Sequence, residues 1–330
     1  MAIETRVDPE TGDWRLVAPG RAARPNDSDP RAEKVCPFCP GNEHLTPPER
    51  MRVPDGAPDW RIRVVPNKYP VVDPSQPTSA TPAVEYRPVF PATGEHEVVI
   101  ESPRHDWDLR EADLAQATEI LFALRRRVRA LEAHRPVVLA FRNYGRAAGA
   151  SLSHPHSQIV ALDRVPPALE DKWHHGRRHY AATRRRLLDD IAATERADAA
   201  RIVADHQNLL VFQPHASVFA HHTTLLPADG AATLAAAADS AIIAVARVLP
   251  AVLTGLAGLL DDPAYNFVVH SGPANERDAG RWYQWHLSIY PRMGTLGGLE
   301  LGTGLAINPT APEATAPMLR DALARASVDP

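Results

Sequence analysis

Two histidines and a glutamine alternate in a glycine-rich part of the sequence. Residues 141–162 read FRNYGRAAGASLSHPHSQIVAL and lie between two apolar runs. In an extended chain alternate side chains point the same way, so His154, His156 and Gln158 would share one face of a strand. A neutral imidazole can attack phosphorus and carry a nucleotidyl group covalently. The pattern therefore predicts phosphate chemistry, although the spacing alone fits a surface loop with hydrogen-bonded histidines equally well.

Groups that bind phosphate surround these histidines. Gly145 and Gly149 allow positive φ and a close approach of the backbone to a ligand. Asn143, Ser151 and Ser157, together with the glutamine and backbone N–H groups, are neutral donors suited to phosphoryl oxygens. The stretch is thus expected to form a phosphate-binding turn that leads into a strand bearing the nucleophile.

The chain has only two cysteines, and they stand close together as Cys36-Pro-Phe-Cys39. Such a pair can form a disulfide, a redox couple or half of a metal site. A redox couple usually lies in a βαβ unit, whereas proline and Gly-Asn follow here, so the pattern favours half of a zinc site. The missing ligands must then be histidines or carboxylates that are distant in the sequence.

The composition is that of a globular chain without a strongly charged surface. The 330 residues can bury the core of one large domain or of two halves. With 44% hydrophobic and 23% charged residues, and no apolar run near the roughly 18 residues of a membrane span, the chain is expected to be soluble. A formal charge of -4 gives no reason to expect nucleic acid or membrane as a partner. The first residues lack the apolar region of a signal peptide, which indicates a cytoplasmic location.

The elements that must position these residues are predicted in the same order twice. The first set comprises strands at 62–65 and from 94, a helix within 108–134 and the strand of the histidines. The second set comprises strands at 209–212 and 223–226, a helix at 231–260 and strands at 265–269 and 286–290. This order predicts an internal duplication, with halves at 1–165 and 205–330. Residues 166–204 are rich in charge and are predicted to form one long, exposed connecting helix.

Taken together, the motifs resemble those of one enzyme family. Cys36-x-x-Cys39, Pro66-Asn67, a strand ending at His105, the stretch 143–158 and Gly298-Leu-Glu300 occur in the order seen in galactose-1-phosphate uridylyltransferases of the histidine triad superfamily. The motif Gly-Ala-Ser…His-Ser-Gln also resembles the motif of the family branch that contains ADP-glucose phosphorylase. The resemblance covers nearly the whole chain. It implies an α+β fold of two histidine triad halves, with antiparallel sheet and flanking helices.

The resemblance implies that His156 is the nucleophile of a ping-pong nucleotidyltransferase. The imidazole would attack the α-phosphorus of a nucleotide sugar, release sugar 1-phosphate and hold the nucleotidyl group until a second sugar 1-phosphate takes it. Gln158 and Ser151 would contact the phosphates during catalysis. The local pattern and the resemblance together give the substrate-binding candidates as Arg21, Arg24, Asn67, Asn143, Ser157 and Glu300. A homodimer is expected, because the matching arginines of the family can reach the site of a neighbouring subunit.

The resemblance also completes the metal site. Cys36, Cys39, His105 and His154 match four ligands that would hold a structural zinc ion. A second metal site of some family members uses one glutamate and three histidines. The matching residues here are His222, His270, His286 and Ser288, and the three histidines could bind zinc or iron.

The base and the sugar stay open at this stage. Leu299 and Gly294 replace a tyrosine and a lysine of the family, so the acceptor need not be galactose 1-phosphate. Uridine follows the larger family and adenine follows the phosphorylase branch. Two other hypotheses are a nucleotide-sugar hydrolase, in which water replaces the acceptor, and a zinc-stabilised binding protein without turnover. The intact His154-Pro-His156-Ser-Gln158 argues against the binding protein, since binding requires no nucleophile.

Overall fold

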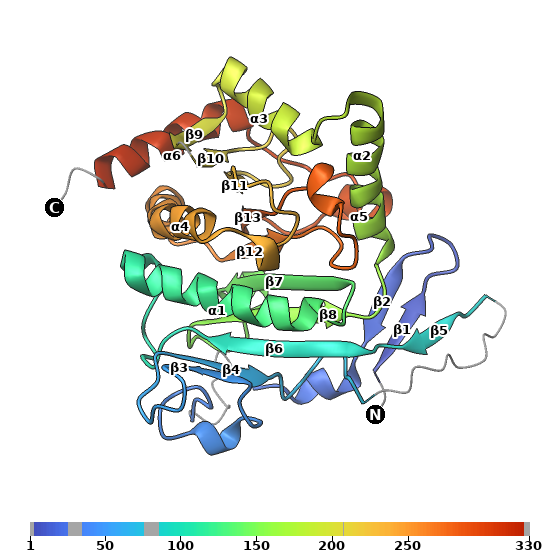
Figure 1. Ribbon diagram of the computed structural model, residues 1–330, viewed down its shortest axis with the longest axis vertical. Helices are drawn as coiled ribbons and strands as arrows, with labels where there is room; N and C mark the ends of the chain where they lie inside the picture. Colours follow the sequence, from blue (N-terminus) through green and yellow to red (C-terminus); the bar gives the residue numbers. More distant parts are fainter. Residues whose placement is uncertain (1–2, 26–34, 76–85, 207, 327–330) are drawn as a thin grey trace.

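The computed structural model describes residues 3–25, 35–75, 86–206 and 208–326, and its main feature is a ten-stranded antiparallel sheet (Figure 1). The strands of this sheet are, in chain order, β3 (Met51–Val53), β4 (Ile62–Pro66), β6 (Gly94–Ile100), β7 (Val137–Tyr144), β8 (His156–Leu162), β9 (Ile202–His206), β10 (Leu209–Phe212), β11 (Thr223–Pro227), β12 (Tyr265–His270) and β13 (His286–Pro291). A smaller sheet contains β1 (Glu4–Val7), β2 (Trp14–Val17) and β5 (Val89–Pro91). The α-helices are α1 (Leu114–Glu132), α2 (Pro167–Thr183), α3 (Leu187–Asp198), α4 (Asp239–Leu260), α5 (Gly298–Thr303) and α6 (Pro312–Ala326).

The strand order of the large sheet repeats one pattern in two halves. From the outer edge inward, the first half runs β3-β4-β6-β8-β7 and the second runs β9-β10-β11-β13-β12. The two halves meet where β7 pairs with β12, so one sheet continues through the molecule. The expectation of two halves with a shared antiparallel sheet and flanking helices is therefore confirmed. The domain limits themselves stay a prediction, and β9 begins inside the predicted connector.

Helices α1 and α4 lie side by side on one face of the sheet, one for each half (Figure 1). The apolar positions of α1 recur at helical spacing and are buried, among them Ile120, Leu124 and Val128. The helix begins later than position 108, because the residues from Asp108 to Glu111 form a separate capped 3-10 turn. The side chain of Asp113 then accepts a hydrogen bond from the N–H group of Gln116 at 2.7 Å and starts α1.

Helix α4 is the apolar core helix of the second half. Its length and its mean hydropathy of 2.0 would suffice to cross a membrane. In the structure, however, it packs against α1, α6 and the strands, and residues such as Ile242, Val245 and Val252 are buried. Burial in the protein core therefore accounts for its hydropathy. Helix α4 begins at Asp239 and not at 231, since a separate 3-10 turn capped by Thr233 precedes it.

The other face of the sheet is covered differently in the two halves. On the second half, α3 packs on Leu210 and Phe212, and α2 brings the buried Trp173 against Trp282. The prediction of one long connecting helix is therefore wrong. Arg184 has φ of 61° and separates α2 from α3. On the first half, N-terminal segments rather than helices lie on this face. They leave a cavity there.

Burial of one carboxyl group between the halves makes stability depend on pH. Thr233 Oγ1 donates to Glu132 Oε2 at 3.0 Å, and burial raises the pKa of Glu132 to about 7. The folded protein therefore holds a proton there between pH 4.5 and about 7 that the unfolded chain has released, so stability falls as the pH rises through this window. Between about pH 5 and about pH 8, we expect the free energy of unfolding to fall by roughly 1 kcal/mol less in the Glu132→Gln protein than in the wild type. Urea unfolding at the two pH values measures this difference. Equal pH dependence in both proteins would contradict this.

Candidate functional site

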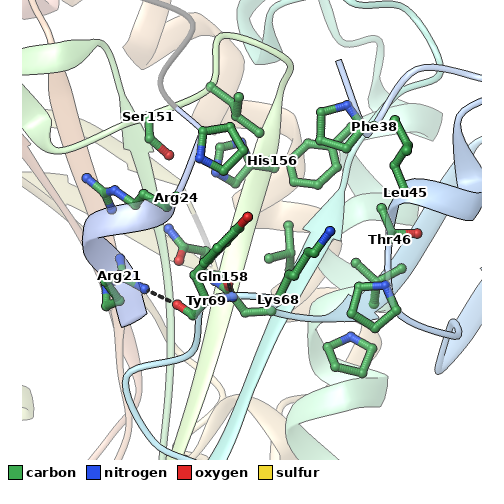
Figure 2. Close-up of a pocket in the computed structure, with 18 of the residues that line it drawn as sticks. Arg21, Arg24, Phe38, Leu45, Thr46, Lys68, Tyr69, Ser151, His156 and Gln158 are labelled. Carbon is green, nitrogen blue, oxygen red and sulfur yellow. Dashed lines mark hydrogen bonds between the residues drawn. The ribbon is translucent and has the colours of Figure 1, made fainter. Parts of the chain in front are cut away.

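His156 and Gln158 lie on the face of β8 that carries no helix, and both side chains point into a cavity of about 440 Å³ (Figure 2). They share this face with Val98 of the neighbouring strand, which pairs with Gln158. Both side chains are only 8% exposed. Residues that are distant in sequence complete the wall, namely Arg21, Arg24, Phe38, Leu45, Thr46, Asn67, Lys68, Tyr69 and Ser151.

The ring of His156 is held in one orientation by the backbone. Its Nδ1 atom lies 2.9 Å from the carbonyl oxygen of His154. A carbonyl can only accept, so Nδ1 must carry the hydrogen and donate it. In the neutral ring the lone pair is then on Nε2. The edge of Phe38 packs against the ring at 5.4 Å between centroids. His156 therefore has the tautomer that a nucleophile attacking through Nε2 requires.

The cavity has a basic wall. Arg21 lies in the 3-10 turn Pro19–Ala23 and Arg24 at its end, and Figure 2 shows Arg24 beside Ser151 and Arg21 beside Tyr69. Arg21 Nη1 donates to the carbonyl of Tyr69 at 2.6 Å, and burial and the neighbouring Arg24 lower the pKa of Arg21. The described residues that line the cavity include no carboxylate. Two guanidinium groups without acidic partners in the wall suit a ligand with several phosphate charges.

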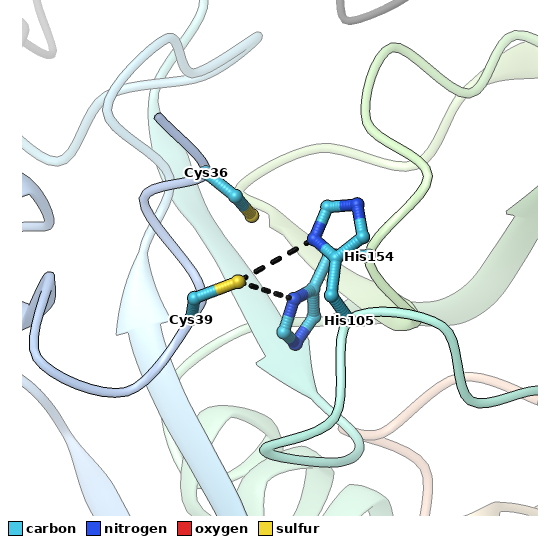
Figure 3. Close-up of side chains that lie close together, drawn as sticks. All are labelled: Cys36, Cys39, His105 and His154. Carbon is cyan, nitrogen blue, oxygen red and sulfur yellow. Dashed lines mark hydrogen bonds between the residues drawn. The ribbon is translucent and has the colours of Figure 1, made fainter. Parts of the chain in front are cut away.

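Cys36, Cys39, His105 and His154 converge at one point next to the cavity (Figure 3). Their ligand atoms all lie within 4.8 Å of one another. Cys39 Sγ is 3.4 Å from His105 Nδ1 and 3.6 Å from His154 Nδ1. A tetrahedral zinc ion with bonds of about 2.3 Å to sulfur and about 2.0 Å to nitrogen would place such atoms roughly 3.5 Å apart. The four residues thus fit a metal ion in a closed site.

The outer ring atoms of both histidines are fixed by hydrogen bonds. His154 Nε2 donates to the carbonyl of Ser102 at 2.8 Å, and His105 Nε2 lies 3.1 Å from Ser153 Oγ. Burial lowers the pKa of His154 to about 4, so its ring is neutral and Nδ1 can offer a lone pair. Burial raises the pKa of Cys36 to about 11, a cost that a bound cation removes by stabilising the thiolate. Because the His154 carbonyl orients His156, the metal cluster also supports the position of His156.

Ser157 does not reach the cavity, which corrects its prediction as a phosphate contact. It follows His156 directly in β8 and therefore points to the opposite face. Its hydroxyl is completely buried and donates to Glu101 Oε1 at 2.5 Å. The other oxygen of this carboxylate accepts from Arg142 Nη1. A buried ion pair thus ties the segment after β6 to β7 and β8 beneath His156.

Breaking this buried pair is expected to cost stability. The Glu101→Gln change removes the carboxylate that pairs directly with the buried Arg142 guanidinium, which should lower the free energy of unfolding by about 3 kcal/mol. Urea unfolding of both proteins measures this difference. A matched double variant, Glu101→Gln with Arg142→Met, should recover part of the loss because no unpaired charge remains. A loss below about 1 kcal/mol in the single variant would contradict the prediction.

Asn143 and Glu300 lie outside the main cavity. Asn143 lines an adjoining cavity of about 360 Å³ that His156 also borders. Its Oδ1 accepts from Asn266 Nδ2 of the second half at 2.8 Å, so the second half positions it. Glu300 lies on α5 and accepts from the N–H group of Gly297 at 3.0 Å, in the manner of a helix cap. Within one chain, the structure brings Asn143 into the same adjoining cavity as His156, whereas Glu300 lines neither this cavity nor the main one.

The proposed second metal site is not formed. His222, His270 and His286 lie on the second half, where the rings of His270 and His286 stack at 4.7 Å. Among the described residues, only the Cys2His2 cluster brings its ligand atoms close enough to chelate an ion. Burial and the charge of Lys172 lower the pKa of His222 to about 4 and that of His286 to about 3. A cationic side chain near neutral histidines opposes a second cation, which is the physical reason for this correction.

Sequence reasoning missed His96. It lies on β6, is 5% exposed, and its Nε2 is 2.9 Å from Gln158 Oε1. The alternation in Gly-Glu-His-Glu-Val places it on the same face as Val98, which was the only available signal.

Residues 1–166 match the family model described as galactose-1-phosphate uridyl transferase, N-terminal domain. The chain is 32% identical to ADP-glucose phosphorylase from Arabidopsis thaliana, over 96% of this chain and 92% of that protein. It is 26% identical to galactose-1-phosphate uridylyltransferase from Thermotoga maritima, over 97% and 98% of the two chains.

Solved structures show the same likeness. A uridylyltransferase structure aligns with a TM-score of 0.83 at 31% identity and covers 98% of this chain and 99% of its own. The ADP-glucose phosphorylase from Arabidopsis thaliana with bound ADP-glucose aligns with a TM-score of 0.78 at 30% identity, over 97% and 99% of the two chains.

Proposed function

The chain belongs to the galactose-1-phosphate uridylyltransferase family and is an enzyme that transfers a nucleotidyl group between a nucleotide sugar and a sugar phosphate. We propose that the transfer takes two steps and passes through a nucleotidyl group bound covalently to His156. One observation carries this proposal. The His154 carbonyl holds the Nδ1–H of His156, which places the lone pair of the neutral ring on Nε2, and the ring lines a cavity with a basic wall.

In the first step, His156 Nε2 attacks the α-phosphorus of the nucleotide sugar. A P–N bond forms, the P–O bond to the β-phosphate breaks, and sugar 1-phosphate leaves with the electron pair. In the second step, a phosphate oxygen of the acceptor attacks phosphorus and the P–N bond breaks, which returns the neutral imidazole. Gln158 and Ser151 donate to phosphoryl oxygens, and Arg21 and Arg24 balance their charge.

The nucleotide is chosen by the apolar end of the cavity. The apolar side chains of Phe38, Leu45 and Val65 line the cavity and, with the amide of Asn67, accept the base and ribose in our proposal. The main candidate donor is UDP-glucose, exchanged with a hexose 1-phosphate. ADP-glucose is the second candidate, because an ADP-glucose phosphorylase is 32% identical over nearly the whole chain.

A panel of nucleotide sugars labelled in the α-phosphate tests both candidates. The protein should acquire acid-labile label at His156 from its natural donor and pass it to an added sugar 1-phosphate or inorganic phosphate. Steady consumption of the donor without any acceptor would indicate a hydrolase instead. No label from any donor, with the metal site loaded, would overturn the covalent mechanism.

We propose that the metal is zinc and that its role is structural. Two thiolates and two imidazoles are the ligand set of closed zinc sites, which leave no position for substrate. When bound, the ion would hold His154 in place, while the proton and phosphoryl transfers remain with the side chains of the cavity. The thiols of Cys36 and Cys39 are free, which fits our assignment to the reducing cytoplasm, a point that cell fractionation would test.

We propose a homodimer for a reason other than the arginines, since Arg21 and Arg24 line the cavity of their own chain. An exposed apolar run surrounds Glu300, in which Leu299 is 54% and Leu301 is 74% exposed. A second copy would cover this run and bring Glu300 to a substrate. We expect the wild type to sediment as a dimer and the Leu301→Asp protein as a monomer, with Leu301→Met as the control. A monomeric wild type would refute this prediction.

A further inference from the structure

His96 is a buried histidine with polar neighbours at both ring nitrogens. The backbone N–H of Val71 lies 3.1 Å from His96 Nδ1. On the other side of the ring, Nε2 lies 2.9 Å from Oε1 of Gln158. His96 is on β6 and Gln158 on β8, and the two residues are diagonal neighbours on the face that forms the cavity.

The backbone contact determines which ring nitrogen carries the hydrogen. A backbone N–H can only donate, so Nδ1 of His96 must be the acceptor and cannot be protonated. A neutral ring has one N–H group, which must then be on Nε2. The Nε2–H group of His96 can donate only to the oxygen of the Gln158 amide. The amide of Gln158 is therefore fixed with its oxygen towards His96 and its NH₂ group away from it.

Neutrality of the ring is supported by its surroundings. Burial is the main effect that lowers the pKa of His96 to about 4, although the bond with Gln158 opposes it. The charge of Arg21 acts in the same direction as burial. At neutral pH the ring is thus uncharged.

We propose that His96 is a positioning residue that orients the Gln158 amide, so that its NH₂ group faces the phosphoryl group transferred to His156. This inference rests on the proposed function. An inverted amide would point its oxygen at the phosphoryl oxygens, where it would repel the charge that develops in transfer. No hydrogen-bond partner for Gln158 Nε2 occurs in the described part of the protein, which leaves this donor for a ligand.

Asn67 is arranged in a similar way. Its Oδ1 accepts from the backbone N–H of Tyr69 at 2.8 Å, so its NH₂ group is on the other side. That group lies 3.1 Å from His96 Nε2, which already carries a hydrogen and cannot accept. The amide hydrogens of Asn67 are therefore also left for a ligand, and Asn67 and Gln158 present two donors along one wall of the cavity.

Two substitutions of similar size separate positioning from structural support. His96→Asn keeps an acceptor near the position of Nδ1 for Val71 but has no donor at the position of Nε2. His96→Gln reaches the position of Nε2 with an amide donor. We expect His96→Asn to lower the rate of His156 labelling roughly 10- to 100-fold, with KM and the melting temperature little changed, and His96→Gln to retain most of the rate. An unchanged rate in His96→Asn, or an equal loss in both variants, would overturn the proposal.

A double-variant cycle tests whether His96 acts through Gln158. If it does, His96→Asn should not slow labelling further when Gln158→Ala is already present. A second loss of about tenfold in that background would show another role. Histidine-selective 15N NMR reads the tautomer without substrate, and the ring signals absent from His96→Asn should show hydrogen on Nε2. Hydrogen on Nδ1 would overturn the inference by itself, whereas absence of labelling in the wild type would overturn the proposed function.

Discussion

The His156→Gly protein is expected to lose nucleotidyl transfer by about 10⁴-fold or more, because it removes the atom that forms the covalent bond. The His154 carbonyl, 2.9 Å from Nδ1 of His156, fixes the hydrogen on Nδ1 and so places the lone pair of the neutral ring on Nε2. No other histidine lines the main cavity among the described residues. The measurement is the rate of exchange of labelled sugar 1-phosphate into nucleotide sugar.

Chemical rescue is the control for this loss. A nucleoside 5′-phosphorimidazolide carries the imidazole that His156→Gly lacks and resembles the covalent intermediate. The variant should therefore transfer its nucleotidyl group to a sugar 1-phosphate, while its melting temperature and metal content match those of the wild type. Failure of rescue in a correctly folded variant would mean that the remaining residues do not perform the second step. Unchanged exchange without rescue would refute the role of His156.

Loss of the metal is expected to have the second largest effect. Cys39 is the ligand whose sulfur contacts both histidines, at 3.4 Å and 3.6 Å, so Cys39→Ser should empty the site. A site that is saturated about 1,000-fold above its dissociation constant contributes roughly 4 kcal/mol to stability, which is lost with the ion. Transfer should fall by more than about 100-fold, because released His154 no longer holds the carbonyl that orients His156.

Elemental analysis and thermal unfolding measure both parts of this expectation. The wild type should contain one metal ion per chain, since the histidines at 222, 270 and 286 do not converge. Cys39→Ser should contain none and melt earlier. His286→Asn is the matched control, because it removes a histidine from the second half and should leave the metal content unchanged. Two ions per wild-type chain would show that the second half does bind metal.

The two halves differ in how the same face of the sheet is covered, and only the first half carries the catalytic residues in our proposal. On the second half, α2 and α3 lie on that face, and Ser288 stands where the resemblance places the counterpart of the nucleophile. On the first half, N-terminal segments approach the face and contribute Arg21, Arg24 and two of the four metal ligands, Cys36 and Cys39. In the described residues, the duplicated sheet thus has the cavity that His156 lines on its first half.

Much of the fold was predictable from the sequence, because the signals are local. Alternation in β8 and helical spacing in α1 depend only on neighbouring residues, and the repeated order of elements predicted the two halves. The placement of His156 and Gln158 on one face followed from the two-residue period of a strand. The same period should have excluded Ser157 from the phosphate. Its polarity suggested a donor, but its position between His156 and Gln158 turns it towards Glu101.

Tertiary structure alone decided which face is open and which atoms of the site are available. The direction of a side chain from a strand is local, but what covers that face depends on distant segments such as 35–47 and α2. The hydrogen on His96 is set by the N–H of Val71, which is 25 residues away, and by no feature of the local sequence. The same holds for the second metal site, where the folded chain places Lys172 near three histidines. Residue types predicted the chemistry, whereas hydrogen-bond partners and burial, which arise only on folding, fixed the tautomers and contacts that perform it.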